Sequence, residues 1–123
     1  MDFFINKGST LPILKMQVVK DGISDYEEFM ALIGDSAIYF SMKDANTGAY
    51  KILNAKAGFT EKTFVDKNVT KDEYYIFYKF TEKNTNRPGL YEGEFVLRHD
   101  TGVQVLPIAD KLNIKIGDSH VRN

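Results

Sequence analysis

The chain has 123 residues, with 16 Lys and Arg against 17 Asp and Glu, and it contains no cysteine. A chain of this length forms one domain that buries roughly two-thirds of its unfolded surface. The net charge of −1 argues against general nucleic-acid binding, which depends on neutralising phosphates. The lack of cysteine excludes disulfides, thiolate nucleophiles and the usual structural zinc sites.

The N-terminal residues carry three apolar side chains, Phe3, Phe4 and Ile5, followed by turn-forming residues 6–10. They lack the positive region and long apolar run of a secretory signal. No stretch of the chain approaches the roughly 18 continuous apolar residues of a membrane helix. We therefore expect a soluble protein with no membrane partner. Two alternatives stay open for residues 1–11: an arm that docks on a neighbouring subunit through Phe3, Phe4 and Ile5, or the first edge strand of the domain's own core.

Alternation of apolar and polar residues predicts most of the strands. The segments that alternate are residues 13–19, 38–43, 49–53, 74–81, 87–98 and 111–116, with hairpin turns at residues 44–48 and 98–103. Residues 54–72 are the least regular part and fit a short strand within a long loop. The strands predict an all-β sandwich over residues 12–117, followed by a loose tail of residues 118–123.

One segment has helical spacing instead. Ser24 and Glu27 are three residues apart, which is the spacing of a helix capping box, and apolar residues then repeat at intervals of three and four up to Ile33. Gly34 follows as a stop signal. The spacing predicts one short helix over residues 24–33 that covers an open end of the sandwich. An amphipathic segment that binds a partner is the alternative.

The strand at residues 87–98 has the clearest pattern. Tyr91, Gly93, Phe95 and Leu97 fall on one of its faces, because strand side chains alternate. In immunoglobulin-like sandwiches a Tyr stands two residues before the position that is Cys in antibodies, and its hydroxyl bonds back to upstream backbone. Gly93 occupies that Cys position here. We predict that Gly89, Tyr91 and Phe95 are structural anchors of the fold.

Residues 74–81 carry aromatic side chains on both faces, and we expect this strand to pair with residues 87–98 across the intervening loop. Its outer side chains, Tyr75 and Phe77, have two interpretations. They contact a partner subunit, because aromatic residues are enriched in interface cores, or they pack beneath residues 54–72. A surface that stacks on sugars is a third use of exposed aromatics, although the chain has no Trp.

No set of residues in the sequence has the spacing of a catalytic or metal site. Glu92 and Glu94 lie on one strand face about 7 Å apart, within the range of inverting glycosidases, but acids two apart on a solvent-facing strand are common. His99 belongs to a predicted hairpin turn, and no Ser sits in a Gly-x-Ser-x-Gly turn. We therefore predict no enzyme activity, no metal and no cofactor.

The chain order of the predicted segments resembles the immunoglobulin-like N-terminal domain of phage baseplate upper proteins, and is similar to other small β-domains of tailed-phage virions. The resemblance covers most of residues 9–117. It rests on an early strand after residues 10–12, the strand and turn of residues 37–48, residues 88–95, the hairpin at residues 100–102 and the closing strand of residues 112–116.

The resemblance implies an immunoglobulin-like antiparallel β-sandwich that serves as a non-enzymatic assembly protein. Such a protein belongs to the baseplate, the tail or neck, or the capsid surface of a virion, and is made in the host cytoplasm. Its partners are other virion proteins and copies of itself, with no nucleic acid, membrane or cofactor. The alternative function is a small carbohydrate- or ligand-binding sandwich that uses Tyr75 and Phe77.

Overall fold

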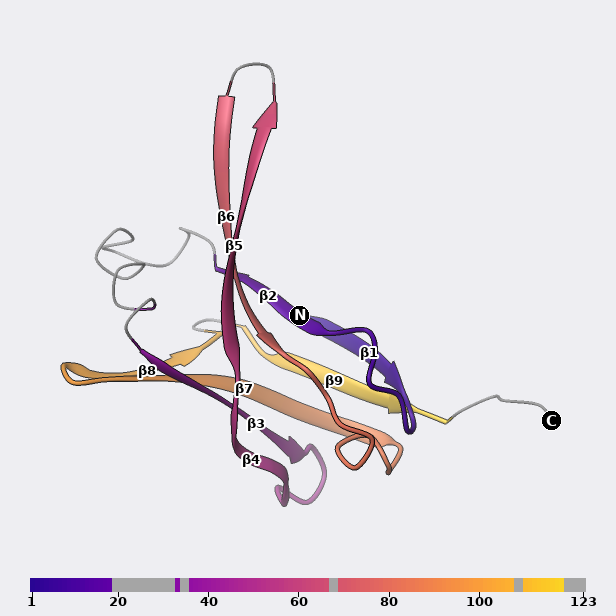
Figure 1. Ribbon diagram of the computed structural model, residues 1–123. Helices are drawn as coiled ribbons and strands as arrows, with labels where there is room; N and C mark the ends of the chain where they lie inside the picture. Colours follow the sequence, from indigo (N-terminus) through magenta and orange to yellow (C-terminus); the bar gives the residue numbers. More distant parts are fainter. Residues whose placement is uncertain (19–32, 34–35, 67–68, 108–109, 119–123) are drawn as a thin grey trace.

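Two β-sheets packed face to face make up the protein, in a computed structural model that describes residues 1–18, 33, 36–66, 69–107 and 110–118. The larger sheet has the order β1-β9-β7-β3-β4, with β8 also paired to β7, and the smaller sheet has the order β2-β6-β5 (Figure 1). The strands are β1 (Asp2–Asn6), β2 (Leu14–Val18), β3 (Ala37–Asp44), β4 (Tyr50–Lys56), β5 (Gly58–Asp66), β6 (Val69–Tyr78), β7 (Gly89–His99), β8 (Gly102–Leu106) and β9 (Leu112–Gly117). The predicted all-β sandwich is confirmed.

Two predicted segments fall largely outside the described residues. The helix predicted for residues 24–33 is described only at Ile33, whose side chain is buried. The tail predicted for residues 118–123 is described only at Asp118, which is exposed.

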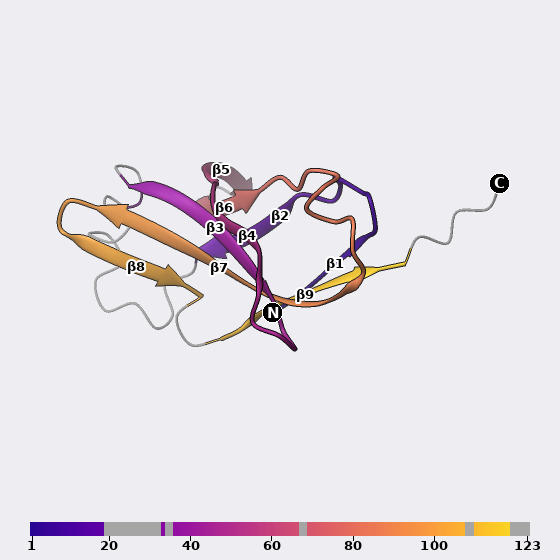
Figure 2. The same ribbon diagram turned by 90° about the horizontal axis from the view of Figure 1, so that it is seen from below.

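The core lies between the two layers, which Figure 2 shows edge-on. Inward positions recur at every second residue along β2, β3, β7 and β9, as strand geometry requires. Four aromatic rings form its centre, because Phe40 stacks on Tyr78 at 4.6 Å and also contacts Phe95 and Phe80. The fully buried residues around them include Leu14, Ile76, Leu97, Leu112, Ile114 and Ile116.

The segment of residues 54–72 differs from the prediction of a short strand in a long loop. It contributes β5 and the start of β6, whose antiparallel ladder runs from Gly58 paired with Phe77 to Asp66 paired with Val69. Within β4, Asn54 has a φ of 52° at the register shift between Phe40 and Met42 of β3, and its N–H donates to the buried Ser41 hydroxyl at 2.9 Å. Asn tolerates this left-handed conformation. β4 stays paired with β3 up to Lys56, and the chain enters the smaller sheet at Gly58.

The predicted pairing of residues 74–81 with residues 87–98 is wrong. β6 pairs with β2 and β5, whereas β7 pairs with β3, β8 and β9. The intervening loop therefore carries the chain from one sheet to the other. Strands that are consecutive in a sandwich often lie in opposite sheets, and alternation predicts which face is buried without predicting the neighbour.

Close packing surrounds the start of β7, where Tyr91 faces the core as alternation predicted. Tyr91 is 3% exposed, and its hydroxyl donates to the Arg87 carbonyl at 2.8 Å. Burial raises the pKa of the Tyr91 phenol, which keeps this donor protonated. Gly93 is required by close packing, because a Cβ there would lie 2.8 Å from Cδ1 of Ile114 and 3.0 Å from Cε1 of Phe40.

Candidate interaction surface

The N-terminal residues form an edge strand of the larger sheet. β1 runs parallel to β9, with Asp2 beside Asn113 and Asn6 beside Gly117. Of the two alternatives for residues 1–11, the edge strand is the one that the structure has, because this strand pairs with its own domain. The sandwich therefore begins at Asp2 and not at residue 12.

Alternation along β1 separates the three apolar side chains that the sequence singled out. Ile5 is 4% exposed, and Phe3 stacks on Phe80 with ring centroids 5.8 Å apart, so both face the core. Phe4 points to the opposite face and is 65% exposed. Phe4 is thus the member of this group that a partner can reach without opening the core.

Beside Phe4, the outer face of the larger sheet has an apolar hollow of about 310 Å³. It lies where β1, β9 and the start of β7 meet, and Leu90 exposes 55% of its surface there. Its lining residues are Asp2, Phe3, Phe4, Ala45, Leu90, Tyr91, Asn113, Ile114 and Lys115. We call this feature the Phe4 hollow.

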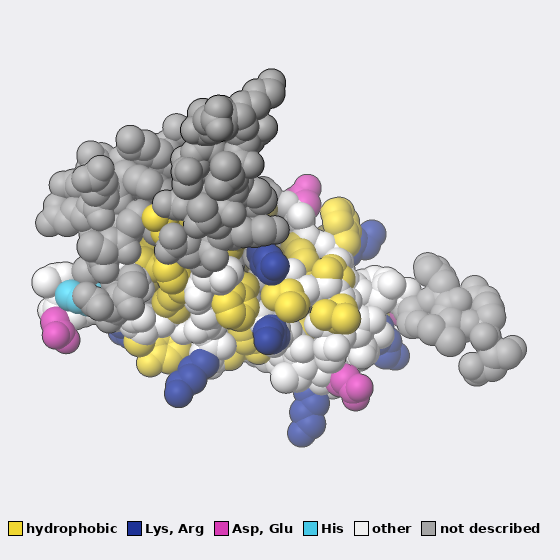
Figure 3. All heavy atoms as spheres, turned by 45° about the horizontal axis from the view of Figure 1, so that its top comes forward, with side chains coloured by type: hydrophobic (Ala, Val, Ile, Leu, Met, Phe, Trp, Pro, Cys, Tyr) yellow, Lys and Arg dark blue, Asp and Glu magenta, His cyan; other side chains and the backbone are white. Residues whose placement is uncertain are grey.

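Large apolar side chains are exposed elsewhere too, as groups interrupted by lysines and arginines (Figure 3). Besides Phe4 and Leu90, those among the described residues are Met1, Leu11, Tyr50, Leu53, Val103 and Val105. Isolated exposed apolar residues are normal on a soluble protein. Phe4 and Leu90 are not isolated, because they share one hollow, and Tyr50 and Val105 likewise share a smaller one.

The turn after β1 is fixed to the loop before β7. The Gly8 N–H donates to the Thr85 carbonyl at 2.9 Å, and the Thr85 hydroxyl donates to the Ser9 carbonyl at 2.9 Å. Thr85 is fully buried, so its side of both bonds is shielded from water. The C-terminal end of β1 is therefore held in place, which orients Phe4 on the outer face.

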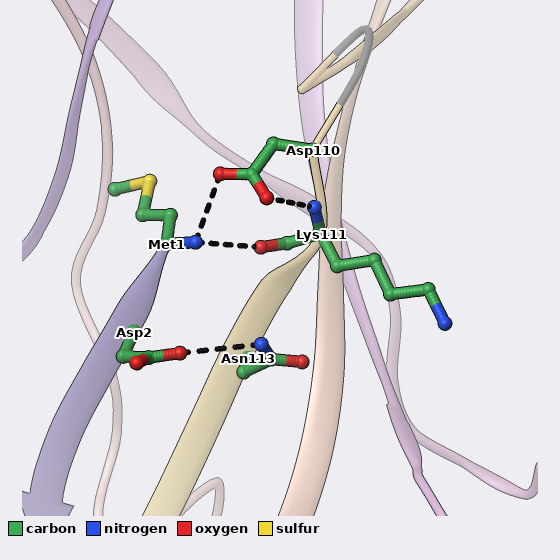
Figure 4. Close-up of polar contacts among 5 residues, drawn as sticks. All are labelled: Met1, Asp2, Asp110, Lys111 and Asn113. Atoms are coloured by element: carbon green, nitrogen blue, oxygen red, sulfur yellow. Dashed lines mark hydrogen bonds and ion pairs between the residues drawn. The ribbon is translucent and has the colours of Figure 1, made fainter.

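Polar contacts hold the other end of β1 (Figure 4). The Met1 amino group donates to Asp110 at 2.9 Å and to the Lys111 carbonyl at 3.0 Å, and the Asn113 amide donates to Asp2 at 3.2 Å. The hydrogen bond to Asp110 raises the pKa of the Met1 amine. The same bond lowers the pKa of the Asp110 carboxyl. Of these groups, Asp2 and Asn113 line the Phe4 hollow.

Glu92 and Glu94 lie further along the same outer face, as expected, in a smaller hollow of about 170 Å³. The Glu92 carboxylate is 3.9 Å from both the Lys43 and the Lys111 ammonium groups. Such separations are at the long end for an ion pair and favour weak, solvent-screened attraction. The arrangement supplies charge balance on the sheet surface.

Tyr75 and Phe77 lie on the outer face of the smaller sheet and are both half-buried. The Phe77 ring covers Gly58 on β5, so closely that a side chain at Gly58 would collide with it. Phe77 therefore packs against the segment of residues 54–72, although that segment is a neighbouring strand and not a loop. Tyr75 faces Gln17 on one side and Thr60 on the other.

The five predicted contact residues thus lie in three different places, two outer faces and the core. Phe4 faces outward from the larger sheet, Tyr75 and Phe77 face outward from the smaller one, and Phe3 and Ile5 face the core. Leu90 and Lys115, which line the Phe4 hollow, were not predicted to belong to a contact surface. Leu90 stood on the outer face of its strand in the sequence pattern, but nothing there indicated that β1 lies nearby.

The described residues also limit other kinds of site. They contain no group of three or more His, Asp or Glu side chains arranged to hold a metal ion. His99 is the last residue of β7, and its Nδ1 is 3.0 Å from the hydroxyl of Thr101 in the β7–β8 turn. Among the residues that the structure describes, no helix is long and apolar enough to cross a membrane.

No protein-family model matches the chain, and neither the curated proteins nor the solved structures include a match.

Proposed function

We propose that this protein is a non-enzymatic assembly component of a tailed-phage virion that works through protein–protein contacts. The single observation that carries the proposal is the Phe4 hollow, an apolar recess beside a 65% exposed aromatic ring on an edge strand. An exposed aromatic residue next to an apolar recess is the arrangement that anchors protein interfaces. The assignment to a baseplate, tail, neck or capsid surface comes from the resemblance in chain order.

The immunoglobulin-like character belongs to the same proposal. It is supported by Tyr91, whose hydroxyl bonds back to Arg87 at 2.8 Å, as in the tyrosine corner of immunoglobulin-like domains. The parallel pairing of β1 with β9 is a departure from a fully antiparallel sandwich. It adds an edge strand without changing the two-layer arrangement.

Mass spectrometry of purified particles tests the proposal. Phage particles whose genome carries this chain are banded on a density gradient and probed for it. We expect the chain to follow the particles through every fraction in a constant ratio to the other virion proteins. A chain that stays in the soluble fraction of the lysate, at normal expression, contradicts the proposal.

The ligand-binding alternative depends on Tyr75 and Phe77. The specific observation in its favour is that both rings lie on one outer face, although Phe77 also covers Gly58. Binding on a glycan array that is lost in Tyr75→Ala, and retained in Phe4→Ala on the opposite sheet, supports it. An array without signal for the wild-type chain removes it.

A further inference from the structure

A row of side chains on the outer face of the larger sheet crosses three strands. Phe4 of β1 is paired in register with Lys115 of β9, and Lys115 is paired in register with Leu90 of β7. Residues opposite each other in a sheet direct their side chains to the same face, and all three residues are exposed. The row thus places one cationic side chain between two apolar ones, and its three members line the Phe4 hollow.

The acidic side chains of the adjacent row already have polar partners. Asp2 stands two residues before Phe4 on the same face, and its carboxylate accepts a hydrogen bond from the Asn113 amide at 3.2 Å. Glu92 is paired in register with Asn113, and its carboxylate lies 3.9 Å from two lysine ammonium groups. In contrast, no carboxylate among the described residues forms an ion pair with Lys115. Within the described part of the chain, the charge of the row that lacks a partner is therefore positive.

The Phe4 hollow is formed before any occupant enters it. Two of its lining residues, Tyr91 and Ile114, belong to the core and are 3% and 1% exposed. Hydrogen bonds at both ends of β1 fix the backbone that carries Phe4. A preformed site loses less conformational entropy on binding than a site that must rearrange.

The size and the lining of the hollow suit a short apolar group. Its volume of about 310 Å³ is at the small end of the range of about 300 to 1,000 Å³ for ligand pockets, so it takes a side chain or two and not a folded element. Phe4 and Leu90 are 65% and 55% exposed, and an apolar group between them removes part of both surfaces from water. These two residues define the apolar part of the occupant.

We propose that the Phe4 hollow binds a short segment of a partner protein in which a carboxylate stands beside an apolar side chain. The apolar side chain enters between Phe4 and Leu90, and the carboxylate pairs with the Lys115 ammonium group. Covering a lysine with a neutral apolar segment costs free energy, because the charge loses water without gaining a partner. A cationic segment adds repulsion to that cost. Charge complementarity therefore selects an acidic occupant.

Phenylbutyrate is a small probe with this chemistry, since it joins an aromatic ring to a carboxylate. Phenylbutylamine is the matched cation, with the same ring on a chain of similar length. Each probe is titrated into the whole isotope-labelled chain, and the amide signals are followed by two-dimensional NMR. We expect phenylbutyrate to shift the signals of Phe4, Leu90 and Lys115, and phenylbutylamine to leave them in place.

Two lysine variants with the same change of charge separate the hollow from the rest of the face. Lys115→Gln should weaken phenylbutyrate binding about two- to fivefold, which is the contribution of an exposed ion pair. Lys111→Gln is the control and should bind as the wild type does, because this lysine lies 3.9 Å from Glu92 and does not line the hollow. Phe4→Ala should remove the shift at Leu90, and its otherwise unchanged spectrum shows that the domain still folds.

This inference rests on the proposed function, because it names the chemistry of the partner of the Phe4 hollow, and the two fail separately. A chain that follows the particles but shows no shift with phenylbutyrate overturns the inference and leaves the assembly function standing. Equal shifts with phenylbutyrate and phenylbutylamine also overturn it, because the hollow is then apolar without selecting charge. Shifts with phenylbutyrate alone, in a chain absent from particles, support the acidic occupant and contradict the virion role.

Discussion

The strands β1 and β2 are matched in length and position, yet they present different edges. Each has five residues, each lies at the edge of its sheet, and each directs alternate side chains into the same core. The outward side chains of β2 include Lys15 and Gln17, both exposed. β1 directs Phe4 outward, 65% exposed, where β2 has Lys15 and Gln17.

The comparison of β1 with β2 distinguishes two requirements for an edge strand. Burial on one face is a requirement of the fold. β2 meets it with three buried side chains, and β1 meets it with Ile5 and the partly buried Phe3. Polarity on the other face protects an edge against added strands. Both outward positions of β2 are polar, whereas β1 has polar Asp2 and Asn6 on either side of apolar Phe4. An edge that meets the first demand and relaxes the second is what an assembly surface requires.

Truncating the inward side chains should have the largest effect on stability, and the effect should be similar for the two strands. Leu14→Ala, at a site with 0% exposure, and Ile5→Ala, at 4%, should each lower the free energy of unfolding by about 2 to 5 kcal/mol. Urea denaturation measures both. A loss below about 0.5 kcal/mol at Ile5 alone would show that β1 is not part of the folded core.

Removing a hydrogen bond that holds the turn between β1 and β2 should have a moderate effect on stability. Thr85→Val removes the hydroxyl that donates to the Ser9 carbonyl and should cost about 1 to 3 kcal/mol, because that carbonyl loses a shielded partner. Hydrogen exchange should show faster exchange in β1 than in β2. Thr101→Val, in the exposed β7–β8 turn, is the matched control and should leave β1 exchange unchanged.

Changing the outward side chains should barely alter stability but should distinguish the strands by association. Phe4→Ala on β1 and Lys15→Ala on β2 are expected to shift the free energy of unfolding by no more than about 0.5 kcal/mol each. Light scattering as a function of concentration should show weaker self-association for Phe4→Ala and wild-type behaviour for Lys15→Ala. Equal behaviour of the two variants would remove the contrast between the edges.

The pH dependence of β1 should be the smallest effect. The Asp110 carboxyl has its pKa lowered from 3.8, so its contribution to stability is present above that value and is lost as pH falls through the folded pKa. The Met1 amine has its pKa raised from 8.0, so its contribution is present below 8.0 and is lost as pH rises through the folded pKa.

Urea midpoints of the wild type and Asp110→Asn, measured across pH, test this pair. The small advantage of the wild type should persist between the two pKa values and shrink beyond either of them. Raising the ionic strength should reduce it, because both groups are exposed to solvent. An advantage that is independent of pH contradicts a role for the charge.

The sequence predicted faces better than neighbours. The inward positions of Leu14, Phe40, Tyr91 and Phe95 follow from alternation, and burial confirms them. Which strands pair was not predictable, because β7 takes its neighbours from β3, β8 and β9, and their register depends on packing of the whole core. The β5–β6 hairpin was not predicted, because β5 begins with a glycine, Gly58. The ring that packs over this glycine belongs to Phe77, on the neighbouring strand β6.

The candidate surface was likewise predictable only in part. Phe4 was singled out from composition, but its separation from Phe3 and Ile5 depended on knowing that residues 2–6 form a strand. The Phe4 hollow also required the neighbours Leu90 and Lys115. Their proximity follows from the parallel pairing of β1 with β9, for which the sequence carried no local signal.

The parallel pairing of β1 with β9 also has a consequence for synthesis. Asp2 contacts Asn113, 111 residues further along the chain, so β1 leaves the ribosome on the order of ten seconds before its partner exists. During that interval Phe3, Phe4 and Ile5 are exposed together on a nascent chain. β1 therefore has to wait unpaired until the chain has been translated as far as β9.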